Sequence, residues 1–185
     1  MDPVIITPDD VAEAGRRASN WKSPGLDGLH HYWLKGLVVC HAVLARHFQE
    51  ALDQKSLPSL FTTGITHLVP KDRDSTDPSK YRPITSLPTI YKTLTSILSA
   101  RITRHLNSNK VTSRAQNGCR GVGRGTKEAL LIDAVIGKVV KRNRRKISAA
   151  WKDYKKAFDS VPHTWIKIVL ELYKVDYTVR DFLGQ

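Results

Sequence analysis

The 185-residue sequence has few sulfur-containing residues and no long apolar run, and both absences limit what the protein can be. Its two cysteines, Cys40 and Cys119, lie far apart with no Cys-x-x-Cys pair, which argues against a disulfide framework and a cysteine-based zinc site. Lys35 and His41 interrupt the longest apolar stretch before it reaches the ~18 residues of a membrane-spanning helix. The first residues also lack the basic and apolar segments of a secretory signal. We therefore expect a cytoplasmic or nuclear protein with no membrane partner.

Acidic residues are scarce relative to basic ones. The sequence has 17 Asp and Glu against 30 Lys and Arg, and the resulting net charge of +13 favours a polyanionic partner such as nucleic acid. The apolar fraction of 41% is that of an ordinary globular domain. The basic charge should therefore lie on a folded protein and not on a disordered tail.

The N-terminal third predicts helices joined by a loop. Thr7, Pro8 and Asp10 have the order of an N-cap, a first-turn proline and the acidic partner in a capping box. The helix that they open should end near Asn20. Pro-Gly and Asp-Gly pairs within residues 21–28 predict a loop. Apolar residues at three- and four-residue steps then predict an amphipathic helix; they are Leu37, Cys40, Leu44, Phe48 and Leu52.

The middle of the chain predicts a β-hairpin followed by a long helix. Residues 64–69 have the composition of a strand that Pro70 closes, and residues 81–85 resume the pattern after a polar segment. Pro88 then opens a helix with a single apolar stripe. The stripe consists of Ile90, Leu94, Ile97, Leu98, Ile102 and Leu106.

The last third predicts two helices and a strand. Thr126 is placed to cap a helix with an apolar side. Apolar and polar residues alternate from 147 to 151 as in a half-buried strand, which leaves Asp153 at the C-terminal end of that strand. Pro162 opens a further helix with four residues expected to face inward: Trp165, Ile168, Val169 and Leu172.

Two carboxylates near this predicted strand are candidates for metal chemistry. A strand that ends in a turn fixes an aspartate and leaves room for substrate, so Asp153 is well placed to hold a hard cation. The more usual role of an aspartate there is to satisfy the backbone of its own turn. Asp159 suggests a paired carboxylate site, but an aspartate ahead of Pro162 is also a common helix cap. The residues alone leave these alternatives open.

The glycine-rich segment 118–126 has the four-residue gap of a phosphate-binding P-loop but not its ending. After Gly123, Arg124 and Gly125 stand where Lys and Ser or Thr are required, so we exclude a nucleoside-triphosphatase site. The basic run 141–146 suits a nuclear-localisation signal, an RNA contact or a solvated turn.

Residues 151–163 closely resemble the first palm motif of reverse transcriptases from non-LTR, LINE-type retrotransposons. Other segments resemble further motifs in the family's order: residues 21–29, 67–71, 81–84 with the helix after them, and 116–126. The resemblance covers nearly the whole chain. It implies an α/β architecture of reverse-transcriptase fingers with a partial palm, helix-rich with a small antiparallel sheet. Residues 1–146 would form the fingers region with N-terminal helices, and residues 147–185 the start of the palm.

The resemblance implies roles for three residues of the predicted palm. Asp153 would be the first metal-binding aspartate, with the backbone carbonyl of Tyr154 as a further ligand. In the complete enzyme two Mg²⁺ ions, about 3.5–4 Å apart, would activate the primer 3′-hydroxyl and stabilise the leaving pyrophosphate. Phe158 would lie under the incoming sugar and exclude a ribose 2′-hydroxyl.

The resemblance also implies contacts outside the palm. Lys71 and Arg82 resemble the fingers residues that hold the triphosphate of the incoming dNTP. Without the resemblance, both would be interpreted as solvated surface cations. Gln116, Arg120 and Arg124 would lie along template and primer, where glycines let the backbone approach a strand and arginines meet phosphates.

The sequence is therefore interpreted as a fragment of an RNA-directed DNA polymerase, with an RNA template, a DNA primer and dNTPs as partners. The family's later Asp-Asp turn and its thumb are not among these residues, so we expect the chain alone to be inactive. The alternative is a non-catalytic basic RNA- or DNA-binding module or a retroelement relic, since Lys152 replaces a usually apolar residue. Phe158 disfavours an RNA-dependent RNA polymerase, which must admit the 2′-hydroxyl.

Overall fold

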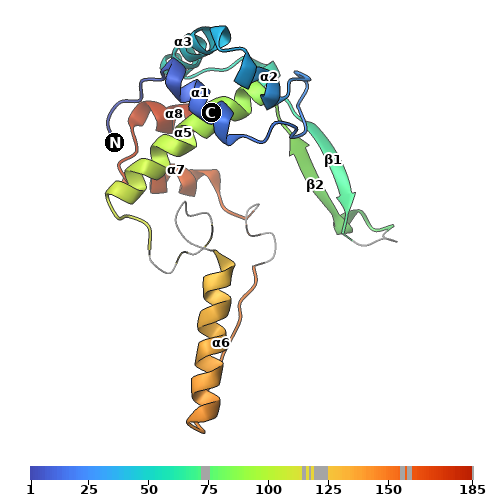
Figure 1. Ribbon diagram of the computed structural model, residues 1–185, viewed down its shortest axis with the longest axis vertical. Coiled ribbons are helices and arrows are strands. Elements are labelled where there is room, and N and C mark those ends of the chain that lie inside the picture. Colours follow the sequence, from blue (N-terminus) through green and yellow to red (C-terminus); the bar gives the residue numbers. More distant parts are fainter. Residues whose placement is uncertain are drawn as a thin grey trace. The chain divides into compact units, whose positions relative to one another are not determined.

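A computed structural model describes residues 1–71, 76–113, 116, 118, 125–154, 157 and 160–184. Within these ranges the chain is rich in helices and has one antiparallel pair of strands, as predicted (Figure 1). It divides into two compact units, Met1–Ile102 with Lys174–Gln185, and Thr103–Tyr173. The expected boundary between fingers and palm after residue 146 stays a prediction.

The first unit contains most of the secondary structure. Its helices are α1 (Pro8–Arg17), α2 (His31–Gly36), α3 (Val39–Asp53), α4 (Ser59–Thr62), most of α5 (Thr89–Ser108) and α8 (Tyr177–Leu183). Its strands are β1 (Ile65–Pro70) and β2 (Tyr81–Ser86), with a short 3₁₀ helix, η1 (Pro78–Lys80), before β2. The second unit contains the end of α5, α6 (Thr126–Arg142) and α7 (His163–Leu172). No helix in the described ranges combines the length and apolarity needed to cross a bilayer.

Helix α1 begins as predicted. The N–H of Asp10 donates to Thr7 Oγ1 at 3.3 Å, and the N–H of Thr7 donates to Asp10 Oδ2 at 3.0 Å. The N–H of Asp10 also donates to the carbonyl oxygen of Thr7 at 3.1 Å, and the reciprocal capping box adds the Thr7 hydroxyl as a second acceptor. The helix ends at Arg17, before the expected end near Asn20, because Ala18 has extended backbone angles.

Buried helix faces form the core of the first unit, and all buried hydrophobic residues of the described chain lie there. Helix α5 buries Leu94, Ile97 and Leu98 from its predicted apolar stripe. Helix α3 buries His41, Ala45, Phe48 and Leu52. The stripe predicted for α3 was wrong at its start, because Leu37 ends α2 and is exposed.

The hairpin predicted for the middle of the chain is confirmed. Strands β1 and β2 pair antiparallel from Ile65 opposite Ser86 to Pro70 opposite Tyr81. All of β1 and most of β2 are exposed to solvent. In Figure 1 the hairpin extends away from the helices of its own unit. Its stability therefore depends on its junction with the helices, because an isolated two-stranded hairpin is marginal in water.

The second unit differs from the sequence-based expectations in three places. Gly125 occupies the N-cap of α6, with φ of 61°, so Thr126 is its first helical residue and not its cap. Residues 147–151 form no strand, and Trp151 is 79% exposed. A strand needs a hydrogen-bonded partner, whereas the two strands of the described chain pair with each other. Helix α7 follows Pro162 as predicted, but none of its residues is buried. Of the four residues expected to face inward, Trp165, Ile168 and Leu172 are exposed and Val169 is half-buried.

Candidate functional site

Positively charged side chains gather at the end of the β-hairpin. The N–H of Lys71, which follows β1, donates to the carbonyl oxygen of Lys80 at 2.9 Å. Arg82 lies opposite Val69 in the register. Opposite residues and residues two apart share a face of an antiparallel pair, so Lys71 and Arg82 share one face. Lys71, Lys80 and Arg82 are all exposed, and none forms an ion pair with another described residue.

Polar contacts fix the two ends of the hairpin. Thr66 Oγ1 and Thr85 Oγ1 lie 2.9 Å apart across the strands, in line with their register. Asp77 precedes β2 and accepts both the N–H of Ser79, at 2.9 Å, and its hydroxyl, at 2.8 Å. The backbone hydrogen bond from Ser79 lowers the pKa of Asp77, which keeps this turn carboxylate ionised. Local hydrogen bonds therefore define the conformation of the segment that leads into the strand of Arg82.

The loop between α1 and α2 packs against the junction between β2 and α5. Asp27 Oδ2 accepts the N–H of Thr89 at 2.6 Å and that of Ile90 at 3.3 Å, so it caps α5 from a distant loop. Thr89 Oγ1 donates to the carbonyl oxygen of Leu29 at 2.6 Å. Gly25 lies against the strand–helix junction, where an added Cβ would be 2.3 Å from the nitrogen of Pro88. The sequence predicts a loop over residues 21–28 but gives no indication of this contact with α5.

The predicted catalytic residues belong to the second unit. Asp153 and Tyr154 lie in an irregular exposed segment, so Asp153 does not follow a strand as expected. Phe158 and Asp159 lie outside the described residues. In the part of the chain that the structure describes, no three His, Cys, Asp or Glu side chains form a metal-binding group. The metal-binding roles of Asp153 and Tyr154 therefore stay predictions.

The predicted template contacts are described only at Gln116. Its side chain is exposed, and Nε2 donates to the carbonyl oxygen of Gly118 at 3.0 Å. Arg120 and Arg124 lie outside the described residues. Lys71 and Arg82 belong to the first unit, whereas Gln116 and Asp153 belong to the second. The structure thus brings Lys71 and Arg82 together at one end of the hairpin, and the roles of all these residues stay predictions.

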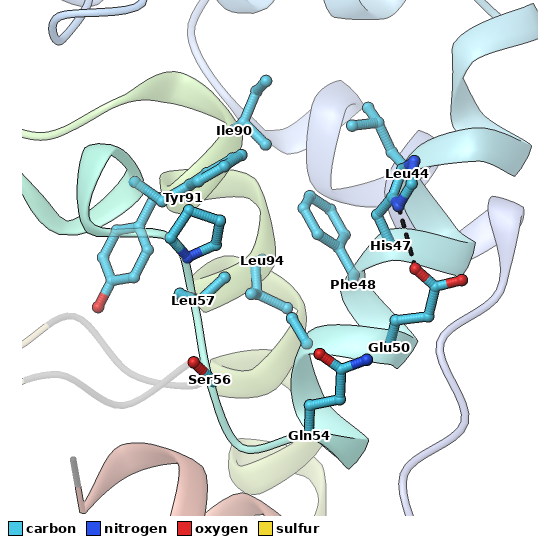
Figure 2. A pocket seen from close by; sticks show the side chains of 13 residues that line it. Leu44, His47, Phe48, Glu50, Gln54, Ser56, Leu57, Ile90, Tyr91 and Leu94 are labelled. Atoms are coloured by element: carbon cyan, nitrogen blue, oxygen red, sulfur yellow. Dashed lines mark hydrogen bonds and ion pairs between the residues drawn. The ribbon is translucent and has the colours of Figure 1, made fainter.

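An apolar pocket of about 450 Å³ lies in the first unit (Figure 2). Phe48 on α3 and Leu94 on α5 contribute to its walls, together with Leu57 from the segment after α3. At its rim His47 Nδ1 lies 3.1 Å from Glu50 Oε2. None of the predicted site residues lines this pocket. We therefore treat it as separate from the candidate nucleotide site.

Comparison with known proteins gives one family and several relatives. Residues 69–184, more than half of the chain, match the family described as reverse transcriptase (RNA-dependent DNA polymerase). The chain is 30% identical over 167 residues to the retrovirus-related Pol polyprotein from type-1 retrotransposable element R2 of Popillia japonica. That alignment covers 88% of this chain and 22% of the relative.

Two further relatives are similar over about the same part of the chain. The chain is 27% identical over 170 residues to the probable RNA-directed DNA polymerase from transposon X-element of Drosophila melanogaster, covering 89% of this chain and 18% of that protein. It is 27% identical over 173 residues to the transposon TX1 uncharacterized 149 kDa protein of Xenopus laevis, covering 91% of this chain and 13% of that protein. The chain thus spans about a fifth or less of the length of these relatives.

Proposed function

This chain belongs to the reverse transcriptase family, and from that premise we propose that it is the part of a LINE-type RNA-directed DNA polymerase that holds the incoming dNTP against template and primer. The observation that carries the proposal is the shared face of Lys71 and Arg82 at the end of the hairpin. Phosphoryl transfer depends mainly on positioning and on cations around the triphosphate oxygens. An exposed pair of cations on a defined backbone suits that task.

The two cations would act in different ways. Arg82 presents a planar guanidinium that can donate two parallel hydrogen bonds to phosphate oxygens, whereas Lys71 supplies a compact charge. Neither is already paired with an acidic residue of the described chain, so neither needs to break an ion pair before the triphosphate binds. Lys80 adds a third positive charge beside them.

Reverse transcriptases generally depend on a divalent metal, and we propose Mg²⁺ as the cation here. Asp153 and the backbone carbonyl of Tyr154 would hold it, since hard cations prefer carboxylate and carbonyl oxygens. When bound, the metal supplies positive charge that stabilises the reacting phosphate oxygens. Because the described residues gather no complete ligand set, the remaining ligands are assigned to residues outside the described part of the chain.

Primer extension tests the proposal on a protein that joins this sequence to the rest of the palm and the thumb. Arg82→Ala should lower kcat/KM for the dNTP about 10- to 150-fold, because it removes a charge-assisted contact of about 1.5–3 kcal/mol. The matched control is Arg46→Ala, which removes an exposed arginine from α3. Equal kcat/KM values for the two variants would contradict the role of Arg82. Intact RNA binding without any extension by the unmutated protein would favour the non-catalytic alternative.

A further inference from the structure

Exposed aromatic rings form a cluster beside α2 in the first unit. The rings of Trp21 and Tyr32 stack with their centroids 5.0 Å apart and an angle of 17° between planes. Trp33 meets Tyr32 edge-on, with 5.3 Å between centroids and an angle of 78°. Trp21, Tyr32 and Trp33 are nevertheless 66%, 46% and 54% exposed. The cluster, defined as these three residues, therefore contacts itself and leaves much of its surface open to a partner.

Hydrogen bonds hold the backbone around the cluster in place. The N–H of Tyr32 donates to the carbonyl oxygen of Asn20 at 3.3 Å. Lys35 Nζ donates to the carbonyl oxygen of Ala18 at 2.8 Å and also to Asn20 Oδ1. His30 Nδ1 lies 3.1 Å from the carbonyl oxygen of Lys22. The chain before Trp21 is thereby tied to α2, so the rings are pre-positioned and a partner would lose little entropy in ordering them.

The charge around the cluster is mainly positive. Burial lowers the pKa of His31, the residue before Tyr32, and the positive charges of Lys92, Lys22 and Lys35 lower it further. Asp27 is the opposing carboxylate in this region, and its Oδ2 accepts the N–H groups that begin α5. Lys22 is exposed directly beside Trp21. A cluster of rings with several lysines around it suits a partner that carries both flat apolar groups and negative charge.

We propose that Trp21, Tyr32 and Trp33 form a base-stacking platform for single-stranded nucleic acid, with Lys22 contacting its phosphates. Single strands expose the faces of their bases, which stack on aromatic side chains with little dependence on sequence. A duplex offers its bases no such contact, because they already stack on one another. The proposal deepens the proposed function, since an RNA template is the single strand that this polymerase would bind.

The test measures binding of the 185-residue chain to a fluorescent 12-nucleotide RNA and to an abasic oligonucleotide of the same length and charge. Trp21→Ala should weaken RNA binding about 5- to 150-fold. Trp21→Phe should retain most of the affinity, because it keeps a ring, whereas Trp21→Leu should behave like Trp21→Ala. Trp165→Ala is the matched control, since it removes another exposed indole, which is 56% exposed in α7.

The abasic oligonucleotide separates stacking from charge. It should bind the unmutated chain and the Trp21→Ala variant with equal affinity, because it has no base that could stack on Trp21. Lys22→Ala should instead reduce the salt slope, which is the steepness with which the logarithm of RNA affinity falls with the logarithm of salt concentration, by about 0.7. A folded Trp21→Leu variant that binds RNA like the unmutated chain would overturn the platform and assign the cluster to a protein partner. That result would not affect the proposed contact between Arg82 and the dNTP. If the unmutated chain does not bind RNA at all, both the platform and the proposed template contact are contradicted.

Discussion

Asp27 Oδ2 accepts the N–H of Thr89 at 2.6 Å, across 62 residues of sequence. This hydrogen bond joins the loop after α1 to the junction between β2 and α5. Segment 21–29 therefore meets the helix that follows residues 81–84, and these two parts of the chain resemble separate family motifs. This contact supports the exposed hairpin that carries Lys71 and Arg82.

Replacing Asp27 should destabilise the first unit. Asp27→Ala leaves the first N–H groups of α5 without their acceptor and should lower the free energy of unfolding by about 1–2 kcal/mol. Asp27→Asn should cost less, because an amide oxygen can still accept. Urea denaturation followed by circular dichroism measures both values. The control is the exposed Asp2→Ala, which should change stability by less than about 0.5 kcal/mol, and a similar small change for Asp27→Ala would contradict the cap.

Two Gly→Ala substitutions should change the stability of the protein in opposite directions. A Cβ at Gly25 would lie 2.3 Å from the nitrogen of Pro88 and 2.4 Å from the carbonyl carbon of Leu87, so backbone must move. Gly25→Ala should therefore cost about 1–3 kcal/mol of stability. Gly137 lies inside α6 with nothing within 4 Å of its added Cβ, so Gly137→Ala should stabilise that helix by about 0.5–1 kcal/mol. Thermal unfolding measures both effects, and changes in melting temperature of the same sign for the two variants would contradict this account.

The ion pair between Asp10 and Arg101 should make stability depend on pH. Burial acts to raise the pKa of Asp10, but hydrogen bonds from Thr7 and Arg101 outweigh it, and the pKa of this carboxyl lies below its usual value. A lowered pKa in the folded state gives stability that is present above the unfolded value of about 3.9 and is lost as the pH falls through the folded value.

Asp10→Asn removes the group that titrates. Its stability should therefore fall less steeply than that of the unmutated chain as the pH drops from about 5 to about 2. Urea denaturation at several pH values gives the change of the unfolding free energy with pH for each of the two proteins. Identical slopes would show that Asp10 does not contribute in this way.

The basic run 141–146 should contribute to salt-dependent nucleic-acid binding. The net charge of +13 predicts that affinity for single-stranded RNA falls steeply between about 50 and 200 mM salt. Changing Lys141, Arg142 and Lys146 together to Ala should reduce the salt slope by up to about 2, because fewer phosphates are neutralised. Fluorescence anisotropy measures both slopes. Affinity that does not change over this salt range would rule out a mainly electrostatic contact.

The sequence predicts those parts of the fold that local patterns determine. The Thr7 cap follows from a signal within a few residues, and the hairpin follows from two strand patterns separated by a polar segment. The hydrogen bond from Lys71 to Lys80, which immediately precedes β2, follows from that hairpin. The cap that Asp27 places on α5 depends on a tertiary contact, for which the local Asp-Gly signal gives no indication.

The sequence predicts less of the second unit, for a physical reason. Alternation from 147 to 151 shows that one side is apolar, but a strand also requires a partner for its hydrogen bonds. The apolar residues of α7 likewise need a covering element before they become a core. Asp153 therefore lies on an exposed segment, and the residues that would surround a metal there do not follow from the nearby sequence.

The most direct test of the central claim is Mg²⁺-dependent primer extension on an RNA template. The 185-residue chain alone should show no extension, whereas the protein extended through its palm and thumb should be active. In that longer protein Asp153→Ala should abolish extension at every dNTP concentration, because it removes charge that stabilises the transition state. Asp159→Asn should retain most of the activity, since Asn can still cap a helix. If Asp153→Ala retains activity while Asp159→Asn abolishes it, the metal has been assigned to the wrong aspartate.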